Sequence, residues 1–318
     1  HSIIYMPVPC EESCPVGAIS KDENGIEKID EEKCILCGKC VNACPFGSIL
    51  ETSEMLEIMY YLKHQIPIIA VIAPSIFSQF KAEPGSMVDA LYKLGFTQVV
   101  EAAEGAMETT RLETEELIHK IGQGQEFMTT SCCASWVLAA NKHVPGILPY
   151  VSDTPSPMAI TAKKCKEQFA GDPVVFIGPC IAKRKEGREN PDVDWVMTFE
   201  ELACLLNAWN IPVVECENIP LNESIDENSR KYCLSGGVAA AVQSQSKHAI
   251  EVQVVNGLDK KQLRMLSNYA RTKKAEGQLI EVMACEGGCI AGPCSHEFPR
   301  DAKRFFAQNS EKFCNCSH

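Results

Sequence analysis

A run of four cysteines with regular spacing constrains the first part of this chain more than any other feature of its sequence. Cys34, Cys37, Cys40 and Cys44 follow the pattern C-x2-C-x2-C-x3-C, and Pro45 comes next. A loop with this spacing wraps three thiolates around one face of a four-iron cubane, and it is among the most specific short metal-binding signals. The chain has 18 cysteines among 318 residues, many in such short groups, which favours metal binding over disulfide bonds.

Residues 1–50 resemble a bacterial ferredoxin, in which the fourth cysteine of each run serves the neighbouring cluster. The partner run is visible only as Cys10 and Cys14. Cys14 is therefore expected to complete the cluster of Cys34, Cys37 and Cys40, whereas Cys10 and Cys44 would hold a possible second 4Fe-4S cluster that lacks two ligands. Either the missing pair lies upstream of the first residue or the second cluster is absent, and we favour a truncated chain. The positions where regular spacing would put the missing pair are those of Ile4 and Pro7.

The charge and the hydropathy of the chain exclude some classes of function. The formal net charge is −12, which argues against nucleic-acid binding because phosphate binding needs a basic surface. This net charge is still compatible with a small redox carrier that docks on a local surface patch. The sequence has no stretch of about 18 consecutive apolar residues, so we predict no membrane-spanning helix. The cysteine usage favours a reducing, anaerobic cytoplasm.

Short apolar runs alternate with helical patterns after a helical connector over residues 51–66. Buried strands that alternate with helices indicate an α/β domain with parallel sheets. We therefore expect a ferredoxin-like domain over residues 1–58 and a second domain over residues 59–318. The expected strands are Ile68–Ile72, Gln98–Val100, Val174–Ile177, Val213–Cys216, Val252–Val255 and Leu279–Met283, and the clearest helices are Gly85–Leu94, Met107–Ile121 and Phe199–Ala208.

Three further runs place cysteines just beyond apolar, strand-like segments. They are Thr130–Trp136 (TSCCASW), Gly178–Lys183 (GPCIAK) and Val282–Cys289 (VMACEGGC). Loops beyond the carboxyl ends of parallel strands are the usual ligand sites, and separated cysteines that converge there suit an iron–sulfur cluster held by four thiolates. In this order the runs resemble the three signature motifs of the catalytic domain of iron–iron (FeFe) hydrogenases, over roughly residues 60–295.

The resemblance implies an α+β or α/β fold in which the ferredoxin-like domain precedes a catalytic domain of two lobes with mostly parallel sheets. It also implies the H-cluster, a 4Fe-4S cubane joined to a two-iron subcluster with CO, CN and dithiolate ligands. The reaction would be 2H+ + 2e− ⇌ H2, with electrons from a ferredoxin-like carrier and with maturation proteins that assemble the two-iron unit. The cubane ligands would be four cysteines, the last of which bridges to the two-iron unit: Cys133, Cys180, Cys285 and Cys289.

The resemblance also assigns a proton path. Cys132 would pass protons to the bridgehead amine of the dithiolate, since a thiol with an unperturbed pKa of about 8.5 can give and take a proton near neutrality. The alternative for this residue is a packed structural cysteine. Glu113 and Glu116 lie on one face of a predicted helix. Such a charged face is typical of a solvated surface, but together with Ser152 these residues match the hydrogenase relay. Lys120 replaces the usual arginine at the outer end of this proton path. The replacement keeps the positive charge but lacks the planar guanidinium group.

Further residues would contact the ligands of the two-iron unit. The amine of Lys183 suits a hydrogen bond to a cyanide, and Pro74 and Ser75 match the segment that contacts the other cyanide. Pro179 and Met283, from the second and third runs, are expected to line the same site.

The chain departs from the hydrogenase motifs at several positions. Gly178 stands where the family has a methionine that packs near the two-iron site, and we expect it to leave space there. Met158 stands where a glutamine is common, and Ala134 with Ser135 replaces Pro-Gly. These changes indicate a divergent branch in which the surroundings of the site are altered.

The sequence leaves two other functions open. One is a non-catalytic H2 sensor built on the same cluster, against which the retained Cys132 and the relay carboxylates weigh. The other is an iron–sulfur assembly factor that shares the fold without the two-iron unit. Lys183 beside Cys180 and the Cys132–Cys133 pair favour the hydrogenase over this class.

Overall fold

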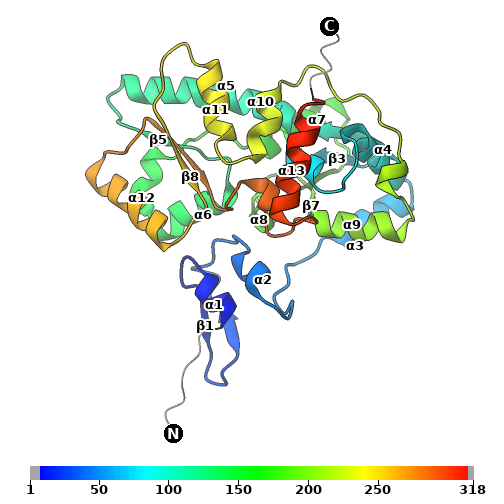
Figure 1. Ribbon diagram of the computed structural model, residues 1–318, viewed down its shortest axis with the longest axis horizontal. Helices are drawn as coiled ribbons and strands as arrows, with labels where there is room; N and C mark the ends of the chain where they lie inside the picture. The colour runs from blue at the N-terminus through cyan, green and yellow to red at the C-terminus, as the bar shows by residue number, and fades with distance from the viewer. Residues whose placement is uncertain (1–7, 314–318) are drawn as a thin grey trace.

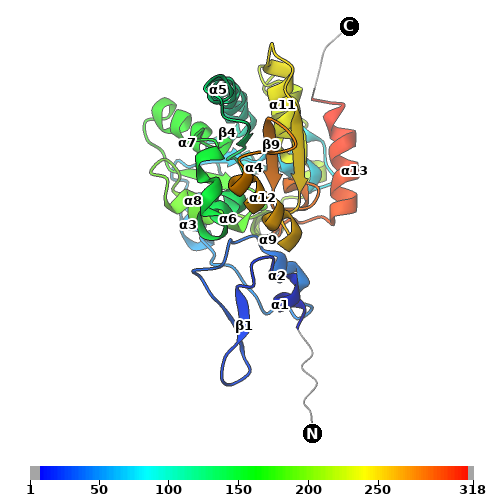
Figure 2. The same ribbon diagram turned by 90° about the vertical axis from the view of Figure 1, so that its left-hand side faces the viewer.

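The computed structural model describes residues 8–313, and they form a small N-terminal part and two lobes. The N-terminal part lies below both lobes, and a connector leads from it into them (Figure 1, Figure 2). Each lobe is built on its own parallel sheet. The α/β fold with two lobes and mostly parallel sheets, expected from the sequence, is therefore confirmed.

The N-terminal part is a short hairpin between two small helices. The hairpin turn closes on Asp22, whose carboxylate accepts hydrogen bonds from the backbone amides of Asn24 and Ile26 at 2.9 and 3.0 Å. A unit this small buries little apolar surface of its own, so contacts with the lobes must contribute to its stability. Its elements are α1 (Pro9–Ser13), the antiparallel pair β1 (Ile19–Lys21) and β2 (Glu27–Ile29), and α2 (Lys39–Ala43).

The first lobe carries a four-stranded parallel sheet in the order β4-β3-β6-β7. Its central strands β3 (Ile69–Ile72) and β6 (Val174–Ile177) are buried along their whole length, as continuous apolar runs in a parallel sheet should be. Connector helix α3 (Met55–Lys63) packs Ile58 and Leu62 into the same core. The other elements are β4 (Gln98–Glu101), β7 (Trp195–Met197), α4 (Pro84–Leu94), α7 (Pro157–Gln168), α8 (Ile181–Arg188), α9 (Phe199–Ala208), α13 (Pro299–Ser310) and the 3-10 turns η1 (Pro74–Ser78) and η3 (Val213–Glu215).

The second lobe carries a three-stranded parallel sheet in the order β5-β9-β8. Within residues 8–313, none of the helices in either lobe has the length and apolar character needed to cross a membrane. The elements of this lobe are β5 (Met128–Thr129), β8 (Val252–Asn256), β9 (Leu279–Met283), α5 (Ala103–Gly122), α6 (Ala134–His143), α10 (Glu227–Arg230), α11 (Gly237–Gln245), α12 (Lys260–Thr272) and the 3-10 turns η2 (Pro145–Tyr150), η4 (Lys231–Cys233) and η5 (Cys289–Ala291).

The expected site segments follow the carboxyl ends of four strands. Pro74 follows β3, Cys133 follows β5, Cys180 follows β6 and Cys285 follows β9. Because β3 pairs with β6 and β5 pairs with β9 in parallel, these ends meet at one edge of each sheet. The order of the strands thus gathers the motif residues at one edge of each sheet.

In the two lobes, one predicted strand is wrong and two short strands were not predicted. Residues Val213–Glu215 form a 3-10 turn, because Pro212 has no amide to donate and Val214 is 67% exposed rather than buried against a sheet. Strands β5 and β7 have two and three residues, too few for a periodic pattern to reveal them.

The loop before α2 fits tightly against the lobes. Gly38 has a φ of +70°, and a Cβ atom there would lie 2.2 Å from the Cβ of Pro293. Ile35 is 1% exposed because it inserts into the core of the second lobe. The amine of Lys39 donates to the carbonyl of Leu258 at 2.5 Å. The cysteine loop is therefore held in one position, and only glycine suits the contact at residue 38.

Two arginines of α8 hold the connector. The guanidinium of Arg184, whose side chain is 3% exposed, forms two hydrogen bonds with the Glu51 carboxylate at 3.0 and 3.1 Å and one with Glu201 at 2.5 Å. Arg188 bonds Glu54 at 2.8 Å. Because α8 begins directly after Cys180, these ion pairs tie the N-terminal part to a segment of the site.

A buried ion pair joins the two lobes. Arg230 ends α10 and is 1% exposed, and its guanidinium forms two bonds of 2.8 Å with the carboxylate of Glu101 at the end of β4. Arg230 also donates to the carbonyls of Ile225 and Asn222 at 3.3 and 2.7 Å. The pair therefore fixes the turn that follows Arg230 against the first lobe.

We predict that Arg230→Leu lowers the free energy of unfolding by about 3–5 kcal/mol, because Glu101 then keeps a buried charge without its partner. The double variant Glu101→Leu, Arg230→Leu removes both charges and should recover most of that loss. Urea unfolding followed by circular dichroism compares the three proteins. Equal losses in the single and double variants would show that the stability of the lobes does not depend on this pair.

Candidate active site

A pocket lies between the facing edges of the two sheets and contains about 540 Å³ of empty space. We call it the inner pocket. Seven of the residues predicted for the site line it, namely Pro74, Ser75, Cys132, Cys133, Lys183, Met283 and Cys289. Eight other residues complete its wall, namely Ala73, Ala102, Ala106, Pro157, Met158, Phe176, Tyr232 and Cys233. The wall is thus mostly apolar, and its few polar groups converge on one space.

The four predicted cubane ligands lie together at one side of this pocket. Burial and the neighbouring Cys133 thiol raise the pKa of Cys180 to about 12. The pKa of Cys289 is also raised to about 12, by burial and by Cys180 and Cys133. Burial raises the pKa of Cys285, and the three other thiols raise it further. Cys133 and Cys289 line the inner pocket whereas Cys180 and Cys285 do not, so the group of four thiols extends from the wall of the pocket into the protein behind it. Pro179, predicted to line the pocket, instead packs against Gly292.

The donor set fits an iron–sulfur cluster. Four thiols in a dry region ionise unfavourably, and bound iron would stabilise them as thiolates. In the described part of the chain, no three His, Cys, Asp or Glu side chains are arranged to hold a single metal ion, whereas in a cubane each thiolate binds its own iron and the sulfurs stay apart. The Ser75 hydroxyl is buried and has no hydrogen-bond partner among residues 8–313. Ser75 lines the inner pocket, where a bound group could accept a hydrogen bond from its hydroxyl.

Lys183 places a positive charge, fixed by an ion pair, at the inner pocket. Its amine bonds the Glu186 carboxylate at 2.6 Å. Burial alone would lower the pKa of Lys183, but Glu186 and the thiols of Cys180 and Cys132 outweigh it and raise the pKa. The ammonium group therefore stays charged and suits an anionic ligand in the pocket.

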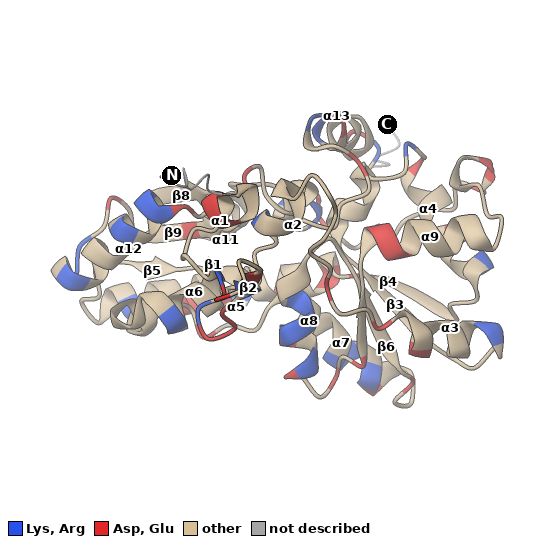
Figure 3. Cartoon of the chain, turned by 90° about the horizontal axis from the view of Figure 1, so that it is seen from below, with Lys and Arg blue, Asp and Glu red and all other residues tan. Residues whose placement is uncertain are grey.

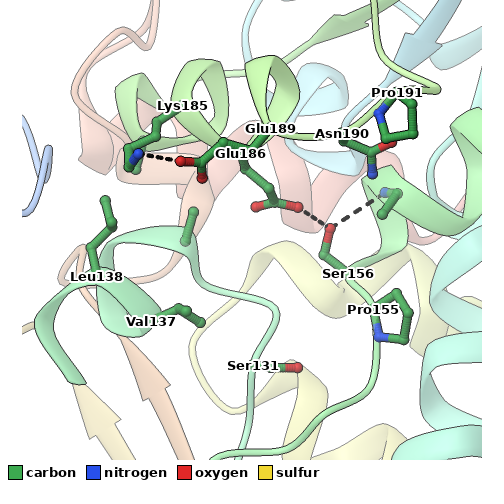
Figure 4. Close-up of a pocket in the computed structure, with 13 residues that line it drawn as sticks. Ser131, Val137, Leu138, Pro155, Ser156, Lys185, Glu186, Glu189, Asn190 and Pro191 are labelled. Carbon is green, nitrogen blue, oxygen red and sulfur yellow. Dashed lines mark hydrogen bonds and ion pairs between the residues drawn. The ribbon is translucent and has the colours of Figure 1, made fainter. Parts of the chain in front are cut away.

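A second, open cleft lies on the other side of Glu186, between α6, α7 and α8 (Figure 4). Ser156, which begins α7, points toward Glu186 and donates to its carboxylate. The cleft is also lined by Ser131 and Pro155 from the loops beside the motif cysteines. Glu186 therefore stands between the cleft and the inner pocket, where it orients Lys183.

The predicted relay residues form a row of polar groups that runs from Lys120 toward Cys132. Lys120 bonds Glu116 at 2.6 Å, and the Ser152 hydroxyl donates to the other Glu116 oxygen at 2.6 Å. Ser152 also lies close enough to Glu113 to lower its pKa. Glu113 in turn lies beside Cys132, because its carboxylate helps burial to raise the pKa of that thiol. The structure thus brings all four predicted relay residues together, and Lys120 takes the outer position.

The two relay carboxyls differ in their protonation. Burial raises the pKa of Glu113 to about 8, although the Ser131 amide donates to its Oε1 at 3.3 Å. Its Oε2 is buried without a partner in the described residues, so this is the oxygen that a proton would occupy. Burial also raises the pKa of Glu116, but bonds from Lys120, Ser152, Asp153 and Thr154 lower it more. A neutral acid therefore lies at the inner end and a carboxylate at the outer end.

Sequence reasoning missed both aromatic residues of the inner pocket. Tyr232 places a buried hydroxyl there, 2.8 Å from the Oγ1 of Thr110. Because the single hydroxyl proton of Thr110 goes to the carbonyl of Ala106 at 2.8 Å, Tyr232 must be the donor to Thr110. Phe176 also lines the pocket, and no motif marked either aromatic residue.

The expectation that Gly178 leaves space is wrong. A Cβ atom at Gly178 would lie 2.7 Å from the ring of Phe176 and 3.3 Å from the Cβ of Ala73. Residues two apart on a strand point to the same face, so the large Phe176 side chain occupies the space beside Gly178. The spacing of the two residues was a signal that could have revealed this.

The N-terminal part has a second candidate cluster site. Cys14, Cys34, Cys37 and Cys40 line one cavity with about 310 Å³ of empty space. Two of these sulfurs accept backbone hydrogen bonds, from Ala18 at 3.2 Å to Cys14 and from Leu36 at 3.4 Å to Cys34. Four cysteines around one cavity are the donor set of a four-iron cluster, so this site also fits such a cluster.

The pair Cys10 and Cys44 is not part of that cavity. Cys10 is buried, and the Cys44 sulfur accepts a bond from the Ser48 amide at 3.4 Å. Ile4 and Pro7 occupy the positions where regular spacing would place the two missing ligands, and both lie outside the described residues. The second N-terminal cluster stays a prediction.

Comparison with known proteins agrees with this geometry. The model of the iron-only hydrogenase large subunit, C-terminal domain, matches residues 66–293, and a 4Fe-4S binding domain matches residues 27–50. Iron hydrogenase 1 of Clostridium pasteurianum is 28% identical over 87% of this chain and 66% of its own length, so the chain spans just under two thirds of that relative. A probable cytosolic Fe-S cluster assembly factor of Drosophila persimilis is 24% identical over 87% of this chain and 75% of its own length.

Solved structures show the same fold. A variant of FeFe-hydrogenase HydA1 from Chlamydomonas reinhardtii has a TM-score of 0.63 and 17% sequence identity, over 83% of this chain and 89% of that chain. Because the matched family model covers most of the chain, including all three cysteine runs around the inner pocket, the chain belongs to the iron-only hydrogenase large-subunit family and carries an N-terminal 4Fe-4S binding motif.

Proposed function

We propose that this chain is an FeFe hydrogenase that catalyses 2H+ + 2e− ⇌ H2. The observation that carries the proposal is the polar chain Lys120–Glu116–Ser152–Glu113, which leads from the surface to Cys132 at the inner pocket. Buried carboxyls are costly to keep. A path of this kind is useful to an enzyme that moves protons and has no use in a protein that only holds or transfers clusters.

In this proposal the H-cluster is the resident cofactor, and its two-iron subcluster with CO, CN and dithiolate ligands occupies the inner pocket. When bound, the cluster supplies the redox chemistry that joins protons and electrons. Lys183 and Ser75 would donate hydrogen bonds to cyanide ligands. Pro74 and Met283, which line the pocket, would help to exclude water. The cubane would be held by Cys133, Cys180, Cys285 and Cys289.

The protons would pass along the side chains described above. Glu116, paired with Lys120, collects a proton at the surface, and the Ser152 hydroxyl passes it on by giving its own proton and accepting another. Glu113 carries the proton on Oε2, and the Cys132 thiol presents it to the inner pocket. A pKa of about 8 at Glu113 lets that acid take up and release a proton near neutral pH.

The electrons would enter through the N-terminal cluster, which is held by Cys14, Cys34, Cys37 and Cys40. The Cys37 thiol contributes to the raised pKa of Cys285, so the two cluster sites adjoin. We propose a ferredoxin-like carrier as the electron partner, maturation proteins that install the two-iron unit, and a cytoplasmic location.

Two rival functions share the fold. The similarity to a cytosolic Fe-S cluster assembly factor favours a role without the two-iron unit, and an H2 sensor would keep the whole cluster without turnover. Reconstitution with iron, sulfide and a synthetic two-iron precursor separates them. We expect infrared bands of CO and CN together with H2 turnover. Complete cubanes without these bands would favour the assembly factor, and bands with almost no turnover would favour the sensor.

We predict that Cys132→Ala lowers H2 turnover by about a hundredfold or more, because it removes the last proton donor but none of the cubane ligands. Cys233→Ala is the matched control, since Cys233 also lines the inner pocket and is not a proposed ligand. Gas chromatography measures turnover, and the infrared bands should persist in both variants. A Cys132→Ala protein as active as the Cys233→Ala protein would contradict the relay.

The second relay prediction concerns the pH dependence of stability. Since the pKa of Glu113 is raised from 4.5 to about 8, the stability from its protonated form is complete below pH 4.5 and is lost as the pH rises through 8. In Glu113→Gln this decline should disappear, and the melting temperature should change less between about pH 5 and about pH 8. Glu115→Gln is the control, because Glu115 lies on the same helix with its side chain 64% exposed. Identical pH profiles for the unmutated and Glu113→Gln proteins would contradict the raised pKa.

A further inference from the structure

A basic surface lies along α12 in a chain whose net charge is −12. Between residues 259 and 276 there are six cations and only two carboxylates. All six cations are exposed, and within the described residues none forms an ion pair with a carboxylate. Four of them belong to α12 itself, and we call these four the basic face: Lys260, Lys261, Arg264 and Arg271.

The basic face points away from the core. The opposite side of α12 buries Leu266 and Tyr269 in the second lobe. Surface cations usually pair with nearby acids or are scattered among them. A row of unpaired cations on an otherwise acidic protein instead makes one place to which an acidic partner is drawn.

The basic face borders the N-terminal cluster site. Leu258, two residues before α12, accepts the hydrogen bond from Lys39, which lies between two proposed cluster ligands. Ile35 of the cysteine loop and Leu266 of α12 share one hydrophobic core. The view from the side of the N-terminal part shows the cations of α12 beside that part (Figure 3).

A further cation lies directly at the cluster loop. The amine of Lys142, in the last turn of α6, donates to the carbonyls of Cys34 and Glu31 at 2.9 and 2.7 Å. Cys34, Cys37 and Cys40 are all partly exposed, so this edge of the cluster site can be approached from outside.

The N-terminal part does not attract the same partner. Residues 8–50 contain eight carboxylates and four lysines, so an acidic protein is repelled by that part and drawn to the neighbouring α12. The two effects together orient the partner at the border between them, where the proposed cluster is nearest.

We propose that the basic face of α12, with Lys142, is the docking surface for a small acidic electron-carrier protein. This inference rests on the proposed function, because it names where the electrons of that reaction arrive. Each reduced carrier is oxidised by one electron as the N-terminal cluster is reduced by one, and two such deliveries supply one H2. The charge of the surface guides the encounter, so its effect depends on salt.

The test compares two double charge reversals. Lys260→Glu with Lys261→Glu changes the basic face, and acidic residues at the first turn of a helix are compatible with its dipole. Lys163→Glu with Lys164→Glu is the matched control, because these are adjacent, exposed lysines of α7 in the other lobe. The probe is an oxidised, acidic bacterial-type ferredoxin with two 4Fe-4S clusters, and its binding to the iron–sulfur-loaded chain is measured by surface plasmon resonance at low and high salt.

We expect the α12 variant to bind the ferredoxin about tenfold or more weakly at low salt, mainly through slower association, and the difference to shrink at high salt. The α7 control should bind like the unmutated chain. Melting temperature and iron content verify that both variants are folded and loaded. Equal binding by the two variants overturns the proposal. Binding of phosphatidylglycerol vesicles by the basic face, without binding of the ferredoxin, overturns it as well.

The binding measurement does not depend on H2 chemistry. Weaker ferredoxin binding by the α12 variant of a chain that makes no H2 would support the docking surface and refute the proposed activity. Unaffected binding in a chain that makes H2 would do the reverse.

Discussion

The structure depends on the meeting of four cysteines at the facing edges of two parallel sheets. Cys133, Cys180 and Cys285 follow strands β5, β6 and β9, and Cys289 follows one turn later. Burial raises the pKa of each thiol, and repulsion by neighbouring thiols raises it further at Cys180, Cys285 and Cys289. Four buried thiols without a partner are a cost to the fold, whereas iron bound to them would link the two lobes. The fold and the proposed chemistry therefore share one requirement.

The other features place two paths against this centre. On one side the relay of α5 carries polar groups through an otherwise dry interior to Cys132. On the other side the cysteine loop of the N-terminal part is fixed by Gly38, Ile35 and Lys39, which brings Cys37 within electrostatic reach of Cys285. The arginine pairs of α8 and the Arg230–Glu101 pair prevent the three parts from shifting. Electron transfer and proton transfer both fall off steeply with separation, so these contacts would matter to both steps of the proposed reaction.

Much of this could be predicted from the sequence because local signals were strong. Continuous apolar runs marked β3, β6 and β9, and the cysteines that follow β6 and β9 marked two loops of the site. Strand β5 could not be predicted from two residues, and the apolar run at Val213 misled because burial is decided by tertiary contacts. Tyr232 and Phe176 reach the inner pocket only through the packing of distant elements. The positions of Glu113 and Ser152 followed from a family resemblance, whereas the raised pKa of Glu113 needed the structure to show how completely it is buried.

The most direct test of the central claim is the iron content of the chain after reconstitution with iron and sulfide alone. Two complete cubane sites predict about eight irons per chain, and Cys133→Ala should bind about four, because only the N-terminal site stays intact. Cys165→Ala is the control, since Cys165 is buried in the core of the first lobe away from both sites and should leave the iron content unchanged. A Cys133→Ala protein that binds as much iron as the Cys165→Ala protein would contradict the four-cysteine centre between the lobes.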